Sequence, residues 1–445
     1  MWKTKIREVF PSVFLLINSI TWFSLTWFVV QGLLTNASFN HILLVSFSYF
    51  GALIVSAIIG ATVLNKKLRE KTWLLTWILL GTVTCSVAPL VAPGASVMNL
   101  FLVSVPLGAL AGLGIPTCLA FFSRNSKAKN RGRNSAVVFF AIQALIAAFY
   151  MAINLVSVDT QFLVLSAWRL VGVASVFFLV PSVEVTAEEQ KTQLIGIIRD
   201  RTFYLYFVPW FLFAIVNFIE EPLLEYHFST PVFVPYDLYT LATFLITSLA
   251  AFLGGVLCDF KGRKVSSILG FVMLGLGFAF LSLLDGMLAQ ILYLTFGGVA
   301  WGVLYVTFIF VVWGDMSEGK NREKYYVLGG MPFLFSNLIS VLVQPFAAVI
   351  LIPSSFSLAS FFLFLAILPL LYAPETLSEK IMKSRELKNY IEKAKREVEK
   401  VRGKEEPDEQ KEECKSDESE PKEDVEFEVG QEEMEKACEL ADKYY

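Results

Sequence analysis

Long apolar runs separated by short polar stretches recur along most of the chain. A helix needs about 20 residues to cross roughly 30 Å of hydrocarbon, and twelve runs approach or exceed that length. They span residues 9–34, 42–64, 72–91, 97–122, 135–156, 162–180, 202–219, 238–257, 265–284, 287–313, 327–350 and 356–372. The pattern predicts an all-α integral membrane protein with twelve transmembrane helices. The first run is too long for a signal-peptide core, so we expect it to be retained.

The polar stretches divide the chain into five parts. We expect an N-terminal six-helix half at 1–180, a cytoplasmic linker at 181–201 and a C-terminal six-helix half at 202–372. Residues 373–403 show a capping box and helical apolar spacing, which predicts a cytoplasmic amphipathic helix. Its bases favour a membrane surface, although the spacing also fits a short coiled coil. Residues 404–445 are rich in Glu, Lys and Asp and predict a largely disordered tail that could bind a cytoplasmic partner.

Three similarities at nearly the same offset indicate that the halves are a parallel repeat. Gly254–Lys264 aligns with Gly60–Glu70 at a shift of 194 residues (254 − 60). Lys129 recurs as Lys320 at a shift of 191 (320 − 129), and Pro181 recurs as Pro374 at a shift of 193 (374 − 181). We therefore expect two halves with the same topology.

The distribution of bases predicts the orientation. Lys and Arg occur before the first run and in the polar stretches after runs 2, 4, 6, 8, 10 and 12, while the alternate stretches contain none. By the positive-inside rule, both termini are expected in the cytoplasm of a multi-pass protein of the cell membrane.

Composition limits the chemistry that the chain can perform. Hydrophobic residues make up 55% of its 445 residues, which excludes an ordinary soluble protein. The five Cys and two His show no metal-binding or disulfide-framework spacing. We expect no metal site, no cofactor, no nucleic-acid partner and no enzymatic activity.

One loop, GGVLCDFKGRK at Gly254–Lys264, interrupts two long apolar runs with an acid, a glycine and bases. Six of its residues spell G-x-L-x-D-x-x-G-R-K, which resembles the inter-helix loop of major facilitator superfamily transporters. That resemblance implies twelve helices in two halves with a substrate cavity between them. Pro374-Glu375-Thr376 is similar to the Pro-Glu-Thr that follows the last helix of sugar porters.

The resemblance also implies gating residues. In such transporters the acid of this loop meets the start of a helix in the other half while the cytoplasmic mouth is shut, which would place Asp259 near Asn134 and Ser135. The degenerate first copy offers a neutral amide and one base at the corresponding positions. The expected gating set is Gly255, Asp259, Gly262, Arg263, Lys264, Asn65 and Arg69.

Polar and aromatic residues at helical spacing form stripes on several of the predicted helices. Amides in hydrocarbon need partners, so each such residue either joins helices or faces a cavity. The resemblance implies that these helices line the cavity. The expected substrate-binding set is Asn18, Trp22, Gln143, Trp210, Asn217, Trp301, Tyr305, Asn337 and Gln344.

Arg169 is the one base within an apolar run away from the basic stretches. It either snorkels or is structurally paired, or else it contacts substrate or a coupling ion. Glu220 and Glu221 follow the end of the seventh apolar run, where they form either a charge pair with Arg169, an outer gate or solvated helix-end carboxylates.

These features together predict a secondary active or facilitative transporter of a small organic solute, working by alternating access and with or without a coupling ion. The fourth run has no Arg and the fifth no Gly or Pro, so the motifs of drug:proton antiporters are missing. An exporter of drugs or organic ions is the weaker alternative. A transport-inactive sensor or scaffold of the same fold is the other.

Overall fold

The computed structural model describes residues 2–377 except 36, 63–69, 92–95, 154, 179–192, 230–235 and 319, and also 383, 387, 391, 393 and 396. Within these residues, twelve helices are long and apolar enough to cross a membrane, which confirms the predicted all-α architecture. All twelve belong to one compact unit, Met1–Ser384. The predicted tail at 404–445, about two thirds of the predicted amphipathic helix and most of the linker lie outside the described residues.

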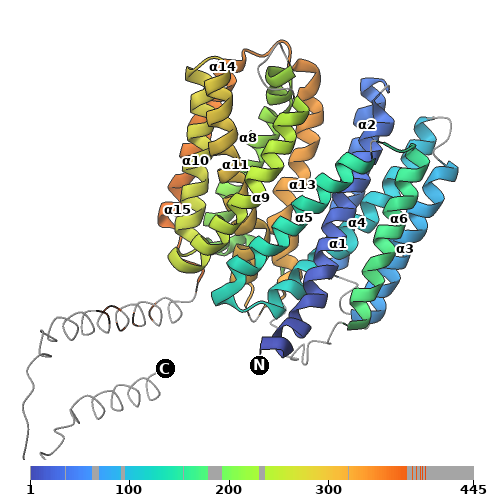
Figure 1. Ribbon diagram of the computed structural model, residues 1–445, viewed down its shortest axis with the longest axis horizontal. Helices are drawn as coiled ribbons and strands as arrows, with labels where there is room; N and C mark the ends of the chain where they lie inside the picture. The colour runs from blue at the N-terminus through green and yellow to red at the C-terminus, as the bar shows by residue number, and fades with distance from the viewer. Residues whose placement is uncertain are drawn as a thin grey trace, which may run out of the picture. The chain divides into compact units, whose positions relative to one another are not determined.

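Six spans precede the linker and six follow it. The first six are α1 (Trp2–Leu34), α2 (Phe39–Thr62), α3 (Glu70–Val91), α4 (Val97–Asn125), α5 (Arg131–Ile153) and α6 (Val158–Phe178), with a short 3₁₀ turn, η2 (Ala128–Asn130), before α5. We call this set the N-terminal half. It occupies the blue-to-teal side of the view in Figure 1.

The remaining six spans form the C-terminal half. They are α8 (Arg201–Ser229), α9 (Tyr236–Lys261), α10 (Arg263–Leu283), α11 (Met287–Tyr305) continued by η3 and α12, α13 (Arg322–Val343), and α14 (Ile352–Leu365) continued by α15 (Ile367–Tyr372). Here η3 is a π-helix (Val306–Val311) and α12 spans Val312–Met316; α7 (Leu194–Arg199) precedes the half and η4 (Gln344–Phe346) follows α13.

Three corresponding pairs of helices are packed in both halves. In the N-terminal half α2 packs on α4, α3 on α6 and α1 on α6; in the C-terminal half α9 packs on α11, α10 on α14 and α8 on α14. Between the halves, α5 packs on α9 and α2 packs on α13. The teal ribbon of α5 therefore lies against the C-terminal half near the middle of the unit (Figure 1).

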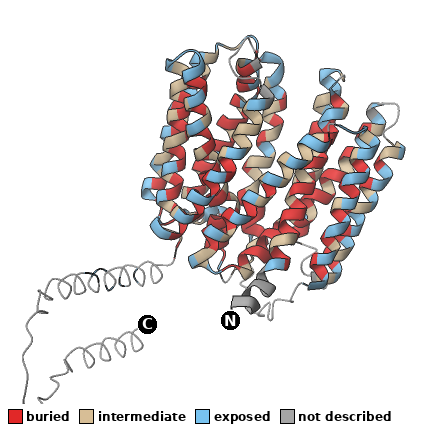
Figure 2. Ribbon diagram, viewed as in Figure 1, coloured by how far each residue is buried: buried red, intermediate tan, exposed pale blue. Residues whose placement is uncertain are grey.

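The outer surface of the bundle is apolar, as a protein in lipid requires. Among the exposed side chains are Val83, Leu102 and Phe177, with 57%, 54% and 70% of their surface accessible. Exposed residues follow the outward faces of the spans, while buried residues follow the inward faces (Figure 2). The apolar exterior and the twelve spans together make this a multi-pass membrane protein.

The two ends of the bundle differ in charge. The bases of the turns at 126–131, 261–264 and 320–324 gather at one end, which we call the basic end. The opposite end, which we call the far end, carries the turns at 155–157 and 284–286, and these contain no Lys or Arg.

Two glycines allow α5 and α9 to cross backbone to backbone near the basic end. A Cβ on Gly255 would lie 2.5 Å from the Gly132 carbonyl oxygen and 2.7 Å from the Ala136 Cβ, and a Cβ on Gly132 would lie 2.5 Å from the Gly255 carbonyl oxygen. Cβ atoms do not approach other heavy atoms so closely. Small residues permit this kind of approach between membrane helices.

This crossing predicts the effect of one methyl group. Gly255→Ala should force α5 and α9 apart, because overpacking of this kind costs about 1–3 kcal/mol, and the unfolding temperature of the detergent-solubilised protein should fall. Gly51→Ala in α2 is the matched control. A Cβ there meets no atom within 4 Å, so the higher helix propensity of Ala should leave the unfolding temperature unchanged or raise it. Equal effects of the two substitutions would contradict the close crossing.

Candidate functional site: a cavity between the halves and the polar network beside it

Asp259, the acid of the Gly254–Lys264 loop, lies at the last turn of α9 and is 1% exposed. Its Oδ1 accepts a hydrogen bond from the backbone N–H of Gly132 at 2.9 Å, and its Oδ2 accepts from the N–H of Arg133 at 3.0 Å. Both amides belong to the first turn of α5, where N–H groups have no partner within the helix and the dipole favours an anion. Asp259 therefore caps a helix of the opposite half, about two residues before the position expected from the sequence.

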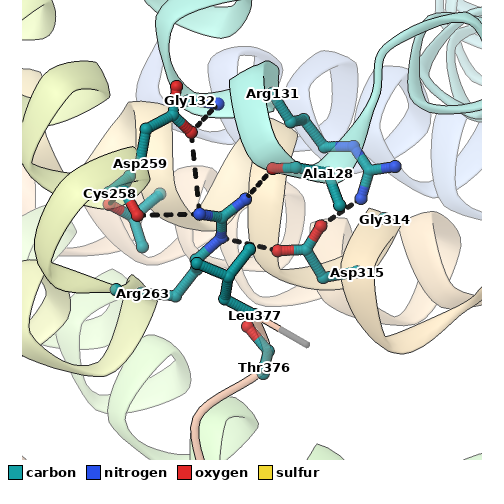
Figure 3. A network of polar contacts seen from close by, with 12 residues as sticks. Ala128, Arg131, Gly132, Cys258, Asp259, Arg263, Gly314, Asp315, Thr376 and Leu377 are labelled. Carbon is teal, nitrogen blue, oxygen red and sulfur yellow. Dashed lines mark hydrogen bonds and ion pairs between the residues drawn. The ribbon is translucent and has the colours of Figure 1, made fainter. Parts of the chain in front are cut away.

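A second buried acid, Asp315 in α12, is held by one arginine from each half. Arg131 of α5 donates to its Oδ1, and Arg263 of α10 donates to its Oδ2 at 2.6 Å. Arg263 also donates to the carbonyls of Cys258 at 2.7 Å and Ala128 at 2.5 Å. Figure 3 shows these groups converging where the halves meet. We call Asp259, Asp315, Arg131 and Arg263 the polar network. Every charge in the cluster is buried and paired, which is the condition for burying charge without a large penalty.

Glu375, just after α15, caps the start of α10 with its carboxylate. It accepts from the backbone N–H of Arg263 at 2.8 Å and of Lys264 at 3.1 Å. The ammonium of Lys264 reaches the carbonyl of Leu371 at 2.7 Å. Gly262 adopts a φ of +100°, and a side chain there would strike the Glu375 carboxylate. The glycine and bases of the loop thus position α10 within the C-terminal half.

A second connection between the halves lies beside α13. Arg124 at the end of α4 forms an ion pair of 2.9 Å with Glu323, and Arg322 donates to the Ser123 hydroxyl at 2.9 Å. None of the predicted site residues was Arg124, Arg131, Asp315 or Glu323. A signal was present, because Arg124 and Arg131 correspond to Asp315 and Arg322 at a shift of 191 residues (315 − 124 and 322 − 131), the offset already found for Lys129 and Lys320.

A cavity of about 210 Å³ lies between the halves, lined by α1, α2, α4 and α5 on one side and by α8, α11, η3, α12 and α13 on the other. Its lining contains no charged residue. Of the nine residues expected to bind substrate, Gln143, Trp210 and Tyr305 line it. Trp313, two residues before Asp315 in α12, also lines it, so the cavity extends toward the polar network.

Trp210 shows how the cavity wall is held. Its indole N–H donates to the Gly329 carbonyl at 2.8 Å, and its ring stacks on Phe308 with centroids 5.0 Å apart and planes at 7°. The hydroxyl of Tyr326 donates to the Phe310 carbonyl at 2.8 Å. These two side chains therefore present aromatic faces to the cavity while their polar groups join the helices around it.

The other expected substrate residues lie elsewhere. Asn217 and Trp301 line a second pocket within the C-terminal half. Asn337 donates to the Phe333 carbonyl at 2.8 Å, Gln344 begins η4, and neither lines the two pockets. Asn18 and Trp22 are fully buried inside the N-terminal half. Asn65 and Arg69 lie outside the described residues.

Asn18 and Trp22 hold Arg169, which is 0% exposed and does not snorkel. Its guanidinium lies between the rings of Trp22 and Trp77, at 4.7 and 4.0 Å from their centroids, and donates to the Asn18 Oδ1 at 3.2 Å and the Ser19 hydroxyl at 3.1 Å. It lies eleven residues after the start of α6 (169 − 158), on the face that packs against α1 and α3. Arg169 is thus a buried cation stabilised by aromatic faces and neutral acceptors.

Glu220 and Glu221 do not end a helix, contrary to the sequence analysis. The helix α8 continues to Ser229, because glutamate is a good helix former and the end of an apolar run does not break backbone hydrogen bonding. Glu220 is 3% exposed and accepts from the Ser355 hydroxyl at 2.7 Å. Among the described ion pairs, none joins Arg169 to either glutamate.

A comparison with solved structures identifies the fold. The chain is similar to the MFS (major facilitator superfamily) proton:xylose symporter XylE bound to 6-bromo-6-deoxy-D-glucose, with a TM-score of 0.64 over 84% of this chain and 96% of that one. The two sequences are 15% identical. No protein-family model and no curated protein matches the sequence. The chain therefore has the major facilitator fold that its loop motif implied.

The Asp259 contact predicts a change in how the halves meet. Asp259→Asn removes the charge that the α5 amides favour by about 0.3–2 kcal/mol. The population of molecules in which the halves are separated at the basic end should therefore grow by up to roughly tenfold. Spin labels at the exposed positions Lys127 and Lys261 would report it as longer distances. The matched control is Asp200→Asn, which removes the charge from a partly exposed 3.8 Å pair with Lys320 and keeps the oxygen that accepts from the Thr202 N–H. Unchanged distances in Asp259→Asn would contradict this role.

The caged guanidinium predicts that Arg169 supports the N-terminal half rather than contacting solute. Arg169→Lys replaces a planar group stacked between two rings by a point charge, so we expect the thermal unfolding temperature to fall, with a loss of about 1–3 kcal/mol. Lys127→Gln, at an exposed position, should leave that temperature unchanged. An unaltered unfolding temperature in Arg169→Lys with abolished solute binding would instead indicate a direct contact with solute.

Proposed function

We propose that the protein is a secondary transporter, active or facilitative, that moves a small, uncharged and largely apolar organic solute across the cell membrane. The observation that carries this proposal is the cavity between the halves, whose wall has aromatic and aliphatic side chains from both halves and no charged residue. Burying an unpaired charge in such a site is costly. The cavity therefore favours neutral solutes over organic acids and free amino acids.

The polar groups of the cavity are few. Since the Trp210 N–H and the Tyr326 hydroxyl already bond to backbone carbonyls, Ser24, Gln143 and Tyr305 provide the hydroxyl and amide groups of the wall. A solute with one aromatic or aliphatic face and two or three hydrogen-bonding groups complements such a wall.

Alternating access is the proposed mechanism. In it, the halves separate at the basic end and the contacts of the polar network break. The network joins the halves at the basic end, which the positive-inside rule assigns to the cytoplasm together with both termini. Asp259 and Asp315 lose partners from the opposite half if that end separates. The structure thus supports a cytoplasmic mouth that is shut by buried ionic contacts and opens when solute or a coupling ion offsets their loss.

Uptake into proteoliposomes tests the proposal. The panel would contain neutral aromatic solutes with several hydroxyls, hexoses, amino acids and dicarboxylates, each measured against protein-free liposomes. We expect saturable uptake of neutral aromatic solutes above the passive leak. Tyr305→Phe and Gln143→Leu should each weaken it by roughly five- to a hundredfold, because each removes a hydrogen bond to bound solute.

Gln344→Leu is the matched control, since it makes the same chemical change outside the cavity and should leave uptake unaltered. Saturable uptake confined to dicarboxylates or amino acids would contradict the proposed solute class. A protein that binds none of the panel and transports none would instead fit a sensor or scaffold of the same fold.

A further inference from the structure

The wall of the cavity between the halves has one bare position on α13. Gly330 lines the cavity, and so do the residues three and four positions before and after it, Tyr326, Val327, Phe333 and Leu334. Residues at these spacings share one face of a helix. Gly330 therefore lies at the centre of the face that α13 turns toward the cavity.

The backbone of Gly330 has open space in front of it. A Cβ built on this residue would meet no atom within 4 Å. Two other glycines of the wall differ: a Cβ on Gly329 would strike the Trp313 ring, and a Cβ on Gly112 would strike the Leu53 carbonyl. Packing between helices thus requires Gly112 and Gly329, whereas at Gly330 the missing side chain leaves room for a solute.

The side chains that flank this space form two different edges. Tyr326 and Phe333 are seven residues apart (333 − 326), which is about two helical turns. Val327 and Leu334 have the same spacing. Each pair therefore runs along one edge of the face, with Gly330 between the pairs. We call the space between this aromatic edge and this aliphatic edge the α13 recess.

Other helices hold both edges in place. The Tyr326 hydroxyl donates to a carbonyl of η3 at 2.8 Å, and the Phe333 ring packs edge-to-face on Tyr305 with centroids 5.7 Å apart. Val327 packs against α2 of the N-terminal half. A recess whose edges are already ordered loses less entropy when it binds a ligand.

The shape of the recess suits a planar ring. A glycine lets a ligand approach the helix backbone closely, and the space left by one missing side chain is narrow. An aromatic ring is one atom thick and can enter such a space, whereas a saturated ring is puckered and thicker. The edges carry no charge, so burying an apolar ring between them is favourable.

We propose that the α13 recess receives a planar aromatic ring of the solute and that Gly330 determines which solutes fit. This inference rests on the proposed function and specifies the part of the neutral solute that α13 recognises. The ring packs on the backbone of Gly330, and any larger residue at this position would occupy the place of the ring.

Calorimetry with two diols tests the recess on the full chain in detergent. One, 4-(2-hydroxyethyl)phenol, has a planar ring; the other, trans-4-(2-hydroxyethyl)cyclohexan-1-ol, carries the same hydroxyl groups on a puckered ring. We expect the wild type to bind the phenol about tenfold more tightly. Gly330→Leu should weaken phenol binding by roughly tenfold or more, because leucine fills the recess, and should remove most of the preference for the planar ring.

Unfolding temperatures distinguish a filled recess from a damaged fold. Gly330→Leu should unfold no earlier than the wild type, because leucine is the better helix former and meets open space. Gly329→Leu should unfold earlier, because its side chain strikes the Trp313 ring. Gly51→Leu is the matched control: this position in α2 is equally open but lies outside the cavity, so phenol binding should not change.

Three results would overturn the inference. Unchanged phenol affinity in Gly330→Leu would overturn the role of Gly330, and a wild type that binds the phenol no better than its saturated analogue would overturn the planar ring. An unfolding temperature of Gly330→Leu as low as that of Gly329→Leu would overturn the open recess. Failure of the proposed function is a separate result, seen as the absence of saturable uptake of every neutral solute in proteoliposomes.

Discussion

Asp315 joins the two halves through buried ionic contacts. Its carboxylate is buried between Arg131 of one half and Arg263 of the other. Separating the halves removes Arg131 from this carboxylate and leaves it with Arg263, and breaking a buried ion pair of this kind costs several kcal/mol. Asp315 therefore lies where the halves meet, and under the proposed alternating access its contact with Arg131 is one that opening of the basic end would break.

The cavity and the ionic network are complementary in character. The charged groups of the network are buried and paired, while the neighbouring cavity has no charged residue in its wall. The link between them is short, since Trp313 lines the cavity two residues before Asp315 on the same helix. The π-helix η3, which places an extra residue in a turn of the same wall, immediately precedes this segment. Under the proposed function, a shift of the cavity wall would reach the network through a single turn of α12.

The sequence was sufficient for the twelve spans, because the length and hydrophobicity of a run are local properties. Helix ends were less certain: α8 continues past Glu220, and the amides that Asp259 caps include that of Gly132, before the apolar run of α5 begins. Helical spacing shows which residues share a face but not which way the face points. Asn18 and Trp22 therefore looked like cavity residues, although they turn toward the guanidinium that α6 places inside the N-terminal half. Such an orientation is fixed by tertiary packing alone.

The bare crossing of α5 and α9 has a mechanical consequence. Because Gly132 and Gly255 approach through backbone atoms, few side-chain atoms separate the two helices at this point. Motion is easiest where interdigitation is least, since packed side chains resist shear. The contact point lies beside the Asp259 cap, near one end of both helices, so a small tilt about it would give a larger displacement at their distant ends. The lever arm of each helix is then nearly the length of one membrane span.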